Sequence, residues 1–164
     1  MIREKKLFIL DMDGTFYLGN KILEGSLSFI NKLRETGKEF IFFTNNASKT
    51  TGFYKKKLLL MGCEISEKNI ITAGDVTIRY IIENYQGNKI YLVGTDLLEE
   101  SFRNSGINLV DKHPDIVVVS FDTSLTYEKI SKACKYIREG AMFLATHMDL
   151  NCPTEDGFIP DCGS

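Results

Sequence analysis

The sequence predicts an α/β protein built on a mostly parallel sheet, because short apolar runs alternate with amphipathic stretches along the chain. The first apolar run, residues 7–10, is continuous, as expected of a strand that is covered on both faces. A chain of 164 residues with 43% hydrophobic and 26% charged residues has a globular composition and can bury a real core.

The first half of the chain predicts two strands, each followed by a helix. Apolar residues recur at helical spacing over 27–34, after the strand over 7–10. The second strand is expected over 40–43. Thr50 or Thr51 can cap the helix after it, which carries Tyr54, Leu58 and Met61 and stops at Gly62.

A second series of elements follows and has strands and helices of its own. We expect helices over 75–85, 97–104 and 127–139, and strands over 89–93, 116–120 and 142–145. This block is therefore predicted to be a separate inserted domain. The tail, 151–164, is rich in Pro, Gly, Asp and Cys and predicts a loop.

Charge and hydropathy exclude several classes of protein. The net charge is −2 and the basic residues form no long run, so no nucleic acid is expected as a partner. No apolar stretch reaches the length of a bilayer span, and no export signal precedes the first strand. The four cysteines match no metal-binding spacing, so we expect reduced thiols in a cytoplasmic protein, with a Cys152–Cys162 disulfide as the less favoured alternative.

Two carboxylates follow the first predicted strand. Asp11 and Asp13 are two residues apart, so their side chains can point to the same side, and Gly14 allows the backbone to turn away. In open α/β sheets, ligands bind beyond the carboxyl ends of the strands. A hard cation such as Mg²⁺ would relieve the repulsion between the two acids. The simpler alternative is that Asp13 and Gly14 only form a turn.

A hydroxyl and two carboxamides end the second predicted strand. Thr44, Asn45 and Asn46 would lie beside Asp11, because neighbouring parallel strands end at the same edge. They offer uncharged hydrogen-bond donors, which phosphate oxygens need. The alternative is a polar cap before the next helix.

Together these segments resemble the first two motifs of the haloacid dehalogenase superfamily. The resemblance is closer to its NagD-like and p-nitrophenyl-phosphatase-like branch, subfamily IIA, and covers essentially the whole chain. Further segments that match this branch are 17–19, 93–96, 145–149 and 160–164.

The resemblance implies a magnesium-dependent phosphatase acting on a small phosphorylated metabolite, of the sugar phosphate or nucleotide type. Asp11 would be the nucleophile that forms an aspartyl-phosphate, and Asp13 the general acid and base. Asp11 and the backbone carbonyl of Asp13 would hold Mg²⁺. The phosphate or substrate ligands would be Asp13, Gly14, Thr44, Asn45, Asn46 and, more weakly, Asp149.

The resemblance also implies a domain plan. Residues 1–74 would form the N-terminal part of a Rossmann-like core, 75–158 an inserted α/β cap of the C2 type, and 159–164 the return toward the core. The family's lysine and its later Gly-Asp segment are not found after the cap. We therefore expect a chain truncated after the cap, weakly active or inactive alone, in which the strand over 7–10 is an exposed apolar edge.

Several alternatives stay open at this point. The chain alone could be a non-catalytic α/β binding module or one completed by a partner, and cap-mediated homodimers would agree with the resemblance. A phosphomutase shares the first motif but usually has a different cap. The two histidines, His113 and His147, are isolated in sequence and are expected to be structural or surface groups rather than metal ligands.

Overall fold

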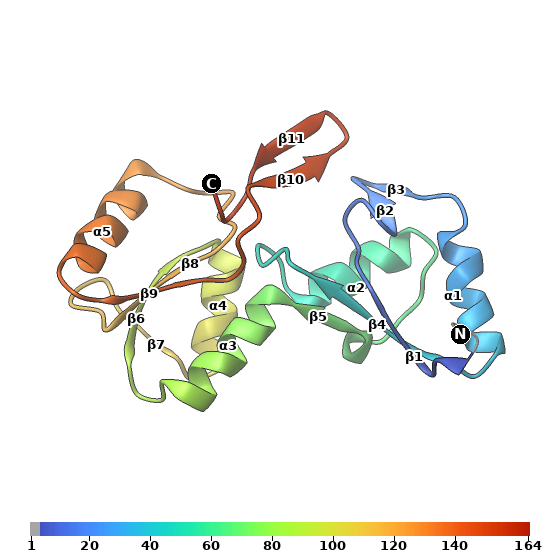
Figure 1. Ribbon diagram of the computed structural model, residues 1–164, viewed down its shortest axis with the longest axis horizontal. Helices are drawn as coiled ribbons and strands as arrows, with labels where there is room; N and C mark the ends of the chain where they lie inside the picture. The colour runs from blue at the N-terminus through green and yellow to red at the C-terminus, as the bar shows by residue number, and fades with distance from the viewer. Residues whose placement is uncertain (1–3) are drawn as a thin grey trace. The chain divides into compact units, whose positions relative to one another are not determined.

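The computed structural model describes residues 4–164, whose contacts divide the chain into two compact units (Figure 1). Within the described residues, the first unit consists of 4–44, 51–72 and 153–159. The second consists of 45–50, 73–152 and 160–164. The predicted α/β class is confirmed, since both units contain parallel sheets with helices.

The domain plan stays a prediction. The division into units differs from the predicted block over 75–158 in four places, of which residues 73–74 and 160–164, both grouped with the second unit, are two. Residues 45–50 group with the second unit, and residues 153–159 group with the first.

A three-stranded parallel sheet with the order β1-β4-β5 forms the centre of the first unit. Its strands are β1 (Leu7–Leu10), β4 (Glu39–Thr44) and β5 (Ile70–Thr72). The accompanying helices are α1 (Ser26–Glu35), α2 (Thr51–Leu60) and the short 3₁₀ helix η2 (Glu67–Asn69). The two long helices fall where apolar periodicity predicted them.

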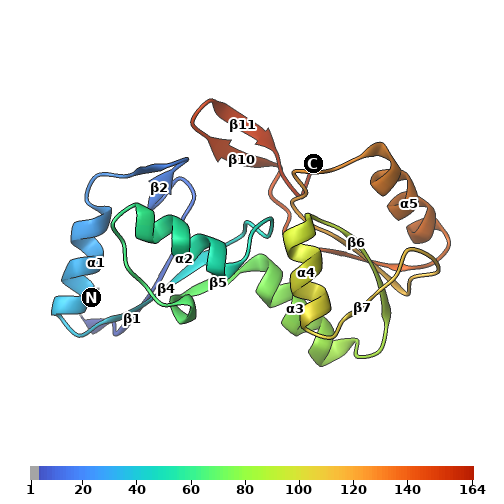
Figure 2. The same ribbon diagram turned by 180° about the vertical axis from the view of Figure 1, so that it is seen from behind.

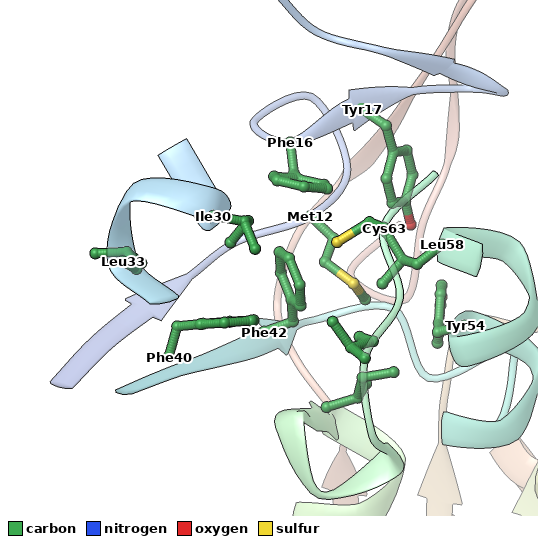
Figure 3. Packing of buried hydrophobic residues seen from close by; sticks show 12 residues of the cluster. Met12, Phe16, Tyr17, Ile30, Leu33, Phe40, Phe42, Tyr54, Leu58 and Cys63 are labelled. Atoms are coloured by element: carbon green, nitrogen blue, oxygen red, sulfur yellow. The ribbon is translucent and has the colours of Figure 1, made fainter. Parts of the chain in front are cut away.

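The core of this unit gathers around Phe42, the fully buried centre of β4 (Figure 3). Ile30 and Leu33 come from α1, and Tyr54 and Leu58 come from α2. Side chains that alternate along β4 point to opposite faces, so Phe42 is buried whereas its neighbour Phe43 is 43% exposed. This core fixes the position of the β4 end.

The prediction that the strand over 7–10 is covered on both faces is wrong. β1 lies at the edge of the sheet, and its outward side chains Leu7 and Ile9 are 46% and 67% exposed. Phe8 and Leu10 pack against the core from the other face. In this chain β1 is thus an edge strand with one exposed apolar face, which agrees with the expected exposed apolar edge.

Two hairpins lie outside the parallel sheets, and the loop predicted over 151–164 is wrong for 151–160, while 161–164 is irregular as predicted. β2 (Tyr17–Leu18) and β3 (Lys21–Ile22) pair directly after the acidic turn. β10 (Asn151–Thr154) and β11 (Gly157–Pro160) form the second hairpin. Its tip residue Glu155 accepts a hydrogen bond from the backbone N–H of Asn20 at 3.0 Å. The β10–β11 hairpin thus fixes the turn of the β2–β3 hairpin.

Replacing Gly19 by alanine is expected to destabilise the first unit more than replacing Gly25. Both glycines have positive φ, 55° and 86°, where a side chain costs about 1–2 kcal/mol. A Cβ at Gly19 would also displace the flexible Glu155 side chain from its hydrogen bond with Asn20, whereas at Gly25 it would meet open space. Urea unfolding of both variants measures the difference, and adding Glu155→Ala should bring the cost of Gly19→Ala down to that of Gly25→Ala. Equal costs in the single variants would contradict the contact.

The second unit contains a four-stranded parallel sheet with helices on both faces (Figures 1 and 2). The strand order is β7-β6-β8-β9, with bounds β6 (Lys89–Val93), β7 (Asn108–Leu109), β8 (Ile116–Val119) and β9 (Met142–Ala145). The helices are α3 (Ala73–Asn84), α4 (Asp96–Asn104) and α5 (Tyr127–Arg138). Residues of α3 and α4 pack on one face and residues of α5 on the other, so β8 is the buried strand that continuous apolar runs predict.

A buried ion pair fixes the loop after β8. The Asp122 carboxylate is 1% exposed and lies 2.6 Å from the Lys129 ammonium of α5. Lys129 also donates to the carbonyl of Gly94, and Ser124 donates to Asp122 through its N–H and its hydroxyl. Burial alone would raise the pKa of Asp122, but the hydrogen bonds from Lys129 and Ser124 outweigh burial and hold it below its ordinary value.

The Asp122→Asn variant is expected to lose about 1–3 kcal/mol of unfolding free energy at neutral pH, because a charge-assisted hydrogen bond is removed. The lowered pKa makes this loss depend on pH. The ionised Asp122 stabilises the folded chain fully above the unfolded-state pKa of about 3.9, and this stabilisation disappears as the pH falls through the lower folded-state pKa. Urea unfolding should therefore show a smaller difference between wild type and variant at about pH 3 than at about pH 7. A difference that stays constant with pH would contradict this assignment.

All four cysteines are free thiols, as predicted, and Cys152 and Cys162 are not joined. Between residues 4 and 164, every helix is too short or too polar to cross a bilayer.

Candidate active site

The turn after β1 presents its two acids and buries the residue between them. Asp11 is exposed and Asp13 half-buried, whereas Met12 is fully buried and points into the core (Figure 3). The carbonyl of Met12 accepts the N–H of Phe16 at 2.9 Å, and the N–H of Gly14 donates to Tyr17 at 2.8 Å. Gly14 has a φ of 81°, which this tight turn requires and which other residues adopt at a cost. The core thus fixes the acids through Met12.

Each acid is held by a hydroxyl four residues later. Thr15 donates to Oδ2 of Asp11 at 2.7 Å, and Tyr17 donates to Oδ2 of Asp13 at 3.3 Å. Burial, and after it the negative charge of Asp13, raises the pKa of Tyr17 far above its ordinary value. Tyr17 therefore stays protonated and donates. Neither Thr15 nor Tyr17 was predicted from the sequence to take part in the site, although a hydroxyl four residues after each acid was a readable signal.

Thr44 ends β4 at the same edge of the sheet as Asp11. Leu10 of β1 pairs with Phe42 of β4, and Thr44 pairs with Thr72 of β5. Both strands run in the same direction, so Asp11 and Thr44 emerge at their carboxyl ends. Thr44 is fully buried, which fixes its hydroxyl within the end of the sheet.

The two asparagines that follow Thr44 make contacts within the second unit. The Asn45 amide donates to Oδ2 of Asp149, a residue 104 positions away in the sequence. The carbonyl oxygen of Asn46 accepts the N–H and the hydroxyl of Ser48, at 2.9 and 2.7 Å. The Asn46 contact lies in the segment before α2 for which the alternative prediction was a polar helix cap. Phosphate binding by Asn45, Asn46 and Asp149 stays a prediction.

The oxygen atoms of the β1 turn are suitable for a hard cation. Magnesium prefers oxygen ligands and is typically held by one or two carboxylates together with waters and substrate oxygens. The Asp11 carboxylate and the Asp13 carbonyl are of this kind. Over residues 4–164, no three His, Cys, Asp or Glu side chains gather into a complete metal cluster, so these residues offer a partial ligand set.

The first unit is an α/β domain with two acids at the end of one parallel strand and a hydroxyl at the end of the next, at the edge of the sheet where such domains bind ligands. Residues 8–108 match the sequence model of the haloacid dehalogenase-like hydrolases, and the chain belongs to that family. The resemblance predicted from the motifs is confirmed.

Named relatives cover almost the whole chain. The 5'-nucleotidase YutF of Bacillus subtilis is 32% identical over 159 residues, which are 97% of this chain and 62% of that protein. An acid sugar phosphatase of Staphylococcus aureus is 32% identical over 99% of this chain and 63% of its own length. The crystal structure of a 4-nitrophenylphosphatase from Thermotoga maritima superposes with a TM-score of 0.94 at 42% identity, over 99% of this chain and 62% of that chain. This chain therefore spans less than two thirds of the length of these relatives.

Proposed function

We propose that this chain carries the nucleophile and the general acid of a magnesium-dependent phosphomonoester hydrolase. The single observation that carries the proposal is the β1 turn, where each of two acids is held by its own hydroxyl beside the buried end of β4. The named relatives, a nucleotidase and a sugar phosphatase, favour small phosphorylated metabolites of the nucleotide or sugar phosphate type as substrates.

Asp11 is the nucleophile in this proposal. One of its oxygens attacks the phosphorus atom, the bond between phosphorus and the leaving oxygen breaks, and an aspartyl-phosphate forms. Thr15 orients the Asp11 carboxylate by its hydrogen bond to Oδ2, so that attack comes from the other oxygen.

Asp13 transfers the protons. It donates its proton to the leaving oxygen and then, as a carboxylate, takes a proton from the water that attacks the aspartyl-phosphate. Phosphate leaves, and Asp11 returns to the free carboxylate. The Tyr17 hydroxyl holds Asp13 in place throughout, because its raised pKa keeps it a donor.

Asp11 and the backbone carbonyl of Asp13 would hold Mg²⁺. When bound, this cation offsets the negative charge of the phosphoryl oxygens and of the attacking carboxylate. Thr44 and the two asparagines would donate hydrogen bonds to the phosphoryl oxygens, a role that does not depend on charge. The N–H of Gly14, which the sequence also suggested as a phosphate ligand, already donates to the carbonyl of Tyr17.

A second candidate is an α/β module that binds phosphate without turnover. The partial set of metal ligands within residues 4–164 favours it for this chain taken alone.

Beryllium fluoride adds to a nucleophilic aspartate as a phosphoryl mimic. Its binding distinguishes both candidate functions from the alternative that the β1 turn has no chemical role. We expect a protein-bound ¹⁹F NMR signal that requires Mg²⁺ and disappears with EDTA. The same protein is then assayed for Mg²⁺-dependent release of phosphate from nucleoside monophosphates, sugar phosphates and p-nitrophenyl phosphate. An adduct together with turnover supports the hydrolase, and an adduct without turnover supports the binding module. The absence of any adduct contradicts both candidates.

A further inference from the structure

We propose that His147 is a positioning residue which, through Asp149, sets the orientation of the Asn45 amide and releases it when the imidazole becomes protonated. The inference rests on the proposed role of Asn45 as a donor to phosphate. The four residues involved, Asn45, His147, Asp149 and Asp161, belong to the second unit.

Asp149 determines which way the Asn45 amide points. The Nδ2 group donates to Oδ2 of Asp149, so the amide nitrogen faces the carboxylate. An amide nitrogen carries two hydrogens, and a carboxylate that accepts one of them leaves the second directed elsewhere. A fixed amide therefore offers a preorganised donor, whereas a rotating amide would present its oxygen to an anion for part of the time.

His147 in turn holds Asp149. Its side chain is 9% exposed, and its Nδ1 accepts the backbone N–H of Asp149 at 3.4 Å. Because Nδ1 accepts, the neutral ring carries its proton on Nε2. The Nε2 atom lies 3.2 Å from Oδ1 of Asp161 but does not have the geometry of a hydrogen bond to it. The Asp161 carboxylate is only 3% exposed and accepts the N–H of Cys162 at 2.6 Å.

One carboxylate oxygen is shared by two potential donors. Nδ1 of His147 lies 3.9 Å from Oδ2 of Asp149, the same atom that accepts the Asn45 amide. A neutral Nδ1 has no hydrogen and does not compete for that oxygen. A protonated Nδ1 repels the Asp149 N–H and attracts Oδ2, so the carboxylate moves from Asn45 toward the imidazolium.

The titratable groups that face the His147 ring are the carboxylates of Asp149, 3.9 Å from Nδ1, and Asp161, 3.2 Å from Nε2. The Cys162 thiol interacts with the Thr146 hydroxyl at 3.6 Å and with the Val119 carbonyl at 3.3 Å. Neither contact involves the imidazole, so the thiol has no direct part in the coupling between His147 and Asn45.

The experiment is a ¹H–¹⁵N NMR titration without ligand from about pH 8 to pH 5, the range in which histidines change charge. The Asn45 side-chain amide signals should shift with the same midpoint as the His147 ring. The step should be lost in His147→Asn and in Asp149→Asn. It should persist in His113→Asn, a matched control, since His113 is exposed and its φ of 50° suits asparagine.

Inorganic phosphate with Mg²⁺ is then added at both ends of the pH range. Acidification should weaken phosphate binding about fivefold more in the wild type than in His147→Asn, a comparison in which the ionisation of phosphate itself cancels. The coupling from His147 through Asp149 to Asn45 is contradicted if the Asn45 signal does not follow the His147 titration, or if the step survives in His147→Asn. If the Asn45 signal follows the His147 titration but phosphate binding does not change with it, the coupling stands and the proposed role of Asn45 in phosphate binding is contradicted instead.

Discussion

Replacing Asp11 by asparagine is expected to abolish phosphoryl transfer, with a loss of at least about a thousandfold in rate for whatever substrate the protein hydrolyses. The amide has nearly the shape of the carboxylate, and its oxygen can still accept the Thr15 hydroxyl that holds Asp11 at 2.7 Å. It carries no negative charge and is too weak a nucleophile to attack phosphorus. The variant should therefore fold normally and lose both turnover and the beryllium fluoride adduct.

Asp111→Asn is the matched control. It makes the same chemical change at an exposed position in the second unit, and both turnover and the adduct should match the wild type. Circular dichroism and urea unfolding of both variants show whether the fold is intact. An Asp11→Asn protein that keeps the adduct would move the nucleophile away from the β1 turn.

Local sequence patterns account for most of the regular elements. β6 and β9 lie where continuous apolar runs predicted them. β2, β3, β5 and β7 were missed because two or three residues carry no measurable period. β5 has only three residues, and β10 contains a proline that reads as a turn. The exposure of β1 follows from its place at the edge of the sheet, which an apolar run does not reveal.

The candidate site shows the same difference between features that follow from local sequence patterns and features that do not. Asp11, Asp13 and Thr44 were readable because each follows an apolar strand, and parallel strands bring their ends to one edge. The partners that hold the site were not readable when they come from far along the chain. Glu155 reaches Asn20 across 135 residues, and Asp149 reaches Asn45 across 104 residues. Such contacts depend on the complete path of the chain rather than on any local pattern.

Replacing Phe42 by alanine is expected to lower the free energy of unfolding of the first unit by about 3–5 kcal/mol. The ring is fully buried, and it meets Phe16 and Phe40 edge to face, with ring centroids 4.7 and 5.7 Å away (Figure 3). Alanine would leave a cavity that β4, fixed between β1 and β5, cannot close by moving.

Phe43→Ala provides the comparison within the same strand. This neighbour faces the opposite side and is 43% exposed, so its truncation should cost about 1 kcal/mol. Urea unfolding measures both losses, and equal losses would contradict the assignment of Phe42 to the core.

The loss of stability in Phe42→Ala should also affect the candidate site, because it is a large part of the total stability of a domain, which is only about 5–15 kcal/mol. Phe42 lies two residues before Thr44 and packs on Phe16, one residue after Thr15. Loosening this contact frees both the end of β4 and the turn that carries Asp11 and Asp13. In Phe42→Ala, beryllium fluoride binding should therefore weaken under conditions in which most of the protein is still folded. In Phe43→Ala it should be unchanged, because the side chain of Phe43 points away from that core.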